Sequence, residues 1–94
     1  MLEPRLKKIS YRAWHRGFRE ADLILGAFAD RCLPTMTEAE LEDFEVLIDQ
    51  PDHDLYGWII GRAPAPPEFE GPVLEALRVF HLTLDLGRGE ARGA

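Results

Sequence analysis

Apolar residues recur every three or four positions in five stretches of the chain, which is the spacing of one face of an α-helix. These stretches cover residues 5–15, 19–31, 37–49, 52–60 and 68–86. In no stretch do apolar and polar residues alternate as they do in a half-buried strand. The pattern therefore predicts an all-α fold, in which five helices with short connections form a small antiparallel bundle in a single domain.

Capping signals mark where several of these helices begin and end. Thr37 and Glu40 have the spacing of a capping box, which predicts a helix that begins just after residue 37. Asp52 is expected to cap the fourth helix, and Gly61 is expected to end it. Gly17 lies between the first two helices, and we expect it to close the first one with a positive φ, which glycine adopts without strain.

Gly26 lies in the middle of the second predicted helix, where a glycine costs about 1 kcal/mol relative to alanine. We therefore expect another element to pack closely against it. After residue 86 the apolar spacing stops, so residues 1–86 are expected to form one helical domain and residues 87–94 a flexible C-terminal tail. The apolar faces predict a core that includes Ile24, Phe28, Leu41, Phe44, Leu47, Ile48, Leu55, Trp58 and Ile59.

Charge is distributed unevenly along this chain of 94 residues, whose net charge is −6. The first 20 residues carry six basic and two acidic side chains, whereas residues 37–54 carry eight acidic and no basic ones. Such asymmetry can steer a charged partner. It can also reflect two solvated faces, and we expect the acidic block to be a solvated face. The negative net charge argues against a nucleic-acid partner.

Candidates for catalytic or metal chemistry are few. The three histidines and Cys32 are widely separated and form no metal-binding pair. Residues 52–63 resemble the opening of a calcium loop, but Tyr56 and Ala63 stand where that loop needs ligands. Ser10 falls on a different helical face from the nearest histidine, so the two residues are not expected to form a pair of nucleophile and general base. We therefore expect no catalytic residue and no metal site.

The segment where the first predicted helix ends and the second begins, residues 16–20, concentrates charge around a glycine, and we call it the corner. Two arginines and a glutamate flank Gly17 in it. A solvated turn explains these residues. Aromatic residues beside arginines are also the usual anchors of protein interfaces, and Tyr11, Trp14 and Phe18 lie close by. Both interpretations stay open from the residues alone.

Two segments together resemble the succinate dehydrogenase FAD assembly factors. Residues 16–22, Arg-Gly-Phe-Arg-Glu-Ala-Asp, contain the RGxxE pattern of that family. Residues 49–59 are similar to its second signature, in which Asp-x-Pro-Asp precedes a leucine, an aromatic residue and a tryptophan. Here either His53 and Asp54 make the spacing one residue longer than in the commoner form, or residues 52–54 stand for Asp-Pro-Asp with histidine in place of proline. The resemblance extends over about residues 5–61, with the segments in the right order.

The resemblance implies a five-helix protein that promotes covalent attachment of FAD to a histidine of the flavoprotein subunit of succinate dehydrogenase, or of fumarate reductase in some bacteria. It implies an assembly factor and not an enzyme. Such a factor acts on FAD in its client and holds none stably itself. By similarity, the motif residues are Arg16, Gly17 and Glu20, and their neighbours Arg12, Arg19 and Asp22 are further candidates for partner binding.

We expect Arg16 and Glu20 to pair with groups on the flavoprotein, and Gly17 to permit close backbone approach. We further expect no membrane insertion, because the longest weakly polar run covers only residues 23–29. We expect the free protein to be a monomer. We also expect it to be located in the bacterial cytoplasm, since no targeting extension is visible. The alternative is a general helical adaptor that binds another protein through its basic end. Whether free FAD binds, and which flavoprotein is the client, stay open.

Overall fold

The computed structural model describes the main chain of residues 4–93 and the side chains of residues 4–84. This part of the chain contains five α-helices and no strand, so the predicted all-α bundle is confirmed. The helices are α1 (Pro4–Trp14), α2 (Arg19–Cys32), α3 (Glu38–Ile48), α4 (Asp52–Ile60) and α5 (Pro72–Gly93). Short 3-10 turns, η1 (Leu33–Thr35) and η2 (Pro67–Phe69), follow α2 and precede α5.

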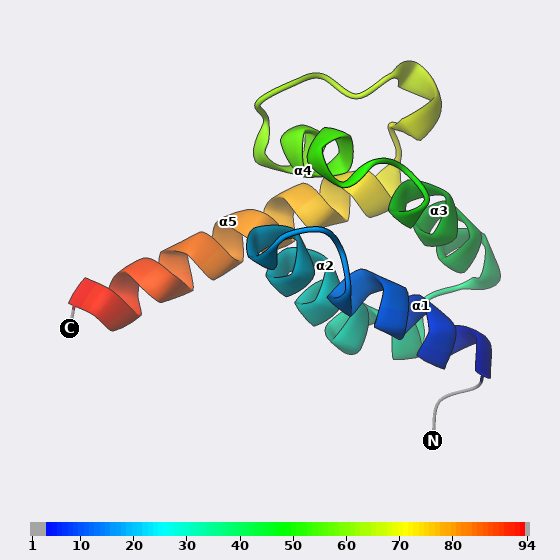
Figure 1. Ribbon diagram of the computed structural model, residues 1–94, viewed down its shortest axis with the longest axis horizontal. Coiled ribbons are helices and arrows are strands. Elements are labelled where there is room, and N and C mark those ends of the chain that lie inside the picture. The colour runs from blue at the N-terminus through cyan, green and yellow to red at the C-terminus, as the bar shows by residue number, and fades with distance from the viewer. Residues whose placement is uncertain (1–3, 94) are drawn as a thin grey trace.

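The long helix α5 contacts α2, α3 and α4 (Figure 1). Helices α1 and α2 pack against each other, as expected for two helices joined by a short corner. Burial of the apolar faces is the main favourable term in folding. These faces meet in one core, whose most deeply buried members include Ile9, Ala13, Leu25, Phe44, Ile48, Leu55, Leu74 and Leu77.

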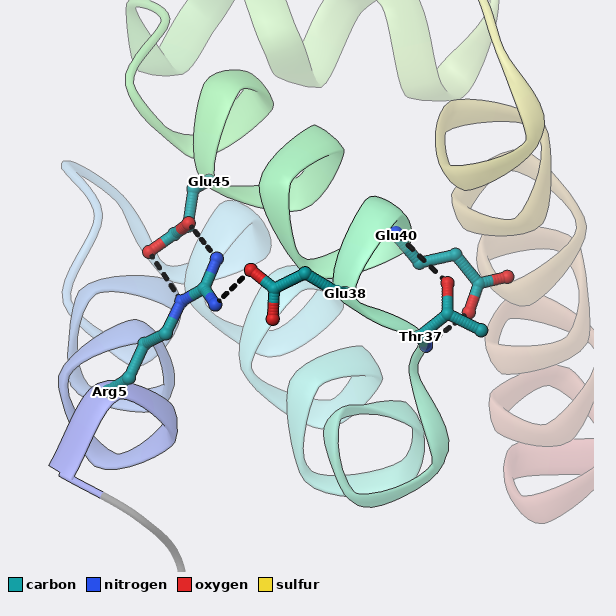
Figure 2. A network of polar contacts seen from close by, with 5 residues as sticks. All are labelled: Arg5, Thr37, Glu38, Glu40 and Glu45. Atoms are coloured by element: carbon teal, nitrogen blue, oxygen red, sulfur yellow. Dashed lines mark hydrogen bonds and ion pairs between the residues drawn. The ribbon is translucent and has the colours of Figure 1, made fainter.

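The N-terminus of α3 has the predicted capping box (Figure 2). The backbone N–H of Glu40 donates to the Thr37 hydroxyl at 3.2 Å, and the N–H of Thr37 donates to the Glu40 carboxylate at 2.9 Å. Two donors that would otherwise lack partners are thereby satisfied. The same view shows Arg5 of α1 reaching across to Glu38 at 2.5 Å and to Glu45 at 2.7 Å.

The close packing expected at Gly26 is confirmed. The indole ring of Trp14 lies where a Cβ of residue 26 would be. The ring is held there because its Nε1–H donates to the Asp30 carboxylate at 3.2 Å. The glycine thus allows α1 to place an aromatic ring directly on the backbone of α2.

Two predictions about helix ends are wrong. Gly17 does not have a positive φ; among the described residues only Gly61 does, at 83°, where it ends α4 as predicted. Helix α1 stops before a bend over residues 15–18, so no left-handed residue is needed to close it. Asp52 does not cap α4, because Pro51 occupies the N-cap position. Asp52 is instead the first residue of the helix, and its carboxylate turns to another partner.

Residue 68 and the position just after Gly71 were both possible starts for α5, since Pro72 suits the beginning of a helix. Helix α5 begins at Pro72, because residues 67–69 form the separate turn η2. Its main chain is helical to Gly93. The predicted division at residue 86 and the flexible tail over 87–94 lie outside the residues whose side chains are described, and both stay predictions. None of the described helices combines the length and the apolar character needed to cross a bilayer.

Candidate functional site

Arg16 joins two segments that are far apart in the sequence, the corner and the start of α4. Its Nη2 lies 2.8 Å from Oδ1 of Asp52. The same nitrogen donates to the backbone carbonyl of Gln50 at 3.1 Å. Because the Arg16 side chain is only 8% exposed, the ion pair is screened by salt less than a surface pair would be. Arg16 is therefore engaged within the protein.

Gly17 lies directly against the same carboxylate. A Cβ on residue 17 would be 2.5 Å from Oδ2 of Asp52, which is far inside van der Waals contact. Asp52 cannot move aside without disturbing its ion pair with Arg16. The corner therefore requires glycine for space, and not for an unusual backbone conformation.

Asp22 fixes the corner from the side of α2. Its Oδ1 accepts a hydrogen bond from the backbone N–H of Arg16 at 2.5 Å. The carboxylate lies in the first turn of α2, where the helix dipole also favours negative charge. Arg16 is thus held twice, through its side chain by Asp52 and through its backbone by Asp22.

A second ion pair lies beside the corner. Arg12, four residues before Arg16, pairs with Asp49 just after the end of α3. Together with Arg5, these arginines form a row that pairs with carboxylates from the acidic block, namely Glu38, Glu45, Asp49 and Asp52. The expectation that this block is only a solvated face is therefore wrong for half of its eight carboxylates. The basic and acidic regions are two sides of one contact.

Phe18 joins the corner to α4 through ring contacts. It precedes α2 in extended backbone, and its ring stacks on His53 with centroids 4.5 Å apart. Its ring also meets Tyr56 edge to face at 5.1 Å. The Arg62 guanidinium lies 5.8 Å from the centroid of the Tyr56 ring, within cation–π range. These contacts extend the packing between the corner and α4 further along α4.

The six predicted site residues fall into two groups. Gly17, Arg19 and Glu20 are exposed, and neither of the two charged ones forms an ion pair with a described side chain. The other three are partly buried and engaged in internal contacts; they are Arg12, Arg16 and Asp22. The partly buried group therefore holds the corner in place, and the exposed group forms its outer surface.

Sequence reasoning did not select the residues of the second segment that complete this site. They are Asp49, Gln50, Asp52, His53 and Tyr56, which all lie within residues 49–59. The opposite charges of the two regions were the available signal for the ion pairs. Nothing in the sequence pointed to the stacking of Phe18 on His53. Across the residues described here, no group of His, Cys, Asp or Glu side chains is placed to hold a metal ion.

Residues 7–81, which include both segments of the site, match the model of a protein family described as flavinator of succinate dehydrogenase. The mitochondrial succinate dehydrogenase assembly factor 2 of Dictyostelium discoideum is 40% identical over 77 residues, or 82% of this chain and 55% of that protein. The FAD assembly factor SdhE of Acetobacter pasteurianus is 38% identical over 76 residues, or 81% of this chain and 70% of that protein. The chain thus spans little more than half of the Dictyostelium relative.

Proposed function

Because this chain belongs to the family described as flavinators of succinate dehydrogenase, we propose that it promotes covalent attachment of FAD to the flavoprotein subunit of that enzyme. It acts by docking onto the flavoprotein with the outer surface of the corner. One observation above all supports this assignment: Arg19 and Glu20 are exposed and pair with no described side chain, on a corner that the ion pair of Arg16 and Asp52 ties to α4. The bacterial cytoplasm is the location we propose, which similarity to the bacterial relative supports.

The role of the protein in this proposal is positional. The flavin ring itself supplies the reactivity for its attachment, so a helper needs only to hold the flavoprotein where histidine and flavin meet. Orientation alone can contribute several kcal/mol to such a step. Glu20 pairs with a basic group of the client, and Gly17 leaves room inside the corner for the Asp52 carboxylate. Arg16 acts from inside by fixing the corner, which revises the expectation that it pairs with the client itself.

The test is co-expression with the flavoprotein subunit in bacteria that lack their own assembly factor. Covalent flavin is then measured as fluorescence of the flavoprotein band in a denaturing gel. We expect the wild-type protein to raise this signal and Glu20→Ala to lower it about tenfold, since one lost charged contact costs about 1.4 kcal/mol or more.

The matched control is Glu42→Ala, which removes an exposed glutamate of α3 that forms no ion pair with a described side chain. It should leave the flavin signal unchanged. Full signal with both Glu20→Ala and Gly17→Arg would refute the assignment of the corner. A wild-type protein that never raises the signal, and that co-purifies with other proteins only, would favour the general adaptor instead.

A further inference from the structure

An apolar groove runs beside the corner, between α2, α4 and α5. Its volume is about 150 Å³, and it is lined by Glu20, Leu23, Ile24, Ala27, Tyr56 and Leu84. A cavity of about this volume with an apolar lining accommodates a group the size of benzene. The groove is therefore large enough for one aliphatic or aromatic side chain of another molecule.

The groove carries a single ionisable carboxylate. Five of its six lining residues offer aliphatic or aromatic surface, and Glu20 is the sixth. Glu20 is exposed and pairs with no described cation. A complementary ligand therefore combines an apolar group with a positive charge next to it.

The groove is continuous with the surface already assigned to docking. Glu20 belongs both to the corner and to the groove lining. Tyr56 lines the groove and also contacts the ring of Phe18 at 5.1 Å. A protein that covers the exposed part of the corner therefore reaches the groove without any change in the structure.

We propose that the groove receives an apolar side chain of the client flavoprotein, next to a Lys or Arg that pairs with Glu20. This inference rests on the proposed function. A second copy of this chain is the competing occupant, but it is less suitable because each copy carries a net charge of −6 and the copies repel. An anchor of this kind, an apolar group in a pocket beside a charged pair, is typical of energetically important interface residues.

The occupant is identified by photo-crosslinking in the full-length protein. The photoreactive residue p-benzoylphenylalanine replaces Leu23 in the groove or, as a control, Leu82, which is exposed on α5 outside it. With purified flavoprotein, the probe at 23 should crosslink to a flavoprotein peptide containing an apolar residue within about two positions of Lys or Arg. The probe at 82 should not. Crosslinks from position 23 to a second copy, or to no flavoprotein peptide, would overturn the proposal.

A variant that fills the groove gives an independent measurement. Ala27→Leu adds apolar volume to the lining without changing charge, and Ala39→Leu makes the same change at an exposed site on α3. We expect Ala27→Leu to weaken flavoprotein binding about tenfold, with Ala39→Leu unchanged. If both variants bind and flavinylate like the wild type, the groove is not used although the proposed function stands. If the wild type itself does not increase the amount of covalent flavin, the proposed function is wrong, and the groove proposal that rests on it is wrong as well.

Discussion

Arg16 and Asp52 form an ion pair of 2.8 Å that ties the corner, at the start of α2, to the first turn of α4. Arg16 belongs to the first family signature and Asp52 to the second. The two signatures are therefore two halves of one contact, although they are far apart in the sequence. Gly17 and Phe18 extend the same contact, because Gly17 packs on Asp52 and Phe18 stacks on His53. Substitutions on either side of the contact should consequently have related effects.

Replacement of Asp52 by alanine should lower the free energy of unfolding by about 2 kcal/mol, because it leaves the largely buried Arg16 guanidinium without its carboxylate. Urea denaturation measures this change. Asp54→Ala is the control, since Asp54 is exposed in the same turn, and it should change stability by less than about 0.5 kcal/mol. A double-mutant cycle with Arg16→Met should show coupling. Strictly additive effects of the two substitutions would mean that the pair contributes nothing.

Gly17→Ala should destabilise the protein by about 1–2 kcal/mol, because the new Cβ meets the Asp52 carboxylate at 2.5 Å and pushes it from Arg16. Thermal unfolding and the flavin assay both measure the effect. The loss should be smaller when Asp52 is already alanine, since the clash is then absent. Gly71→Ala is the control, because its Cβ finds no atom closer than 3.9 Å. An equal loss in both backgrounds would show that contact with Asp52 is not the reason for glycine at 17.

Gly26→Ala tests whether packing or helix propensity has the larger effect on stability at this position. Alanine favours a helix by about 1 kcal/mol, but its Cβ would overlap the Trp14 ring, and overpacking typically costs about 1–3 kcal/mol. We expect a net loss of stability by urea denaturation. Gly57→Ala provides the matched comparison, because this buried glycine of α4 has no neighbour closer than 3.6 Å to the new Cβ. It should be neutral or stabilising. A stabilised Gly26→Ala protein would mean that the Trp14 ring moves freely.

The helices were predictable because their causes are local. Apolar spacing located all five helices, and the Thr37 and Glu40 capping box marked the start of α3. Gly26 was also informative, since a glycine inside a helix lowers stability unless something packs on it. Each of these signals lies within a few residues of the feature that it predicts.

The pairing of residues within the site was not predictable, because its contacts join residues that are distant in the sequence. Asp52 after a proline has the appearance of a helix cap, and no local rule shows that its carboxylate pairs with Arg16. Gly17 was ambiguous for a related reason: a glycine can serve a positive φ or a close approach, and only the neighbour in space decides between them. The charge pattern indicated which regions attract each other, but not which residues pair.

The contact between Arg5 and Glu45 makes stability depend on pH (Figure 2). Hydrogen bonding to Arg5 lowers the pKa of the Glu45 carboxyl below its ordinary value of 4.5. A carboxyl whose pKa is lower in the folded state stabilises the protein above its unfolded pKa, and this contribution is lost as the pH falls through the folded pKa. Glu45→Gln should therefore lower the Tm at pH 7, and its difference from the wild type should shrink as the pH falls below 4.5. Glu42→Gln on the same helix is the control, and it should match the wild type throughout. A Tm difference for Glu45→Gln that stays constant from pH 7 to acid would contradict this origin, because an uncharged contact does not titrate.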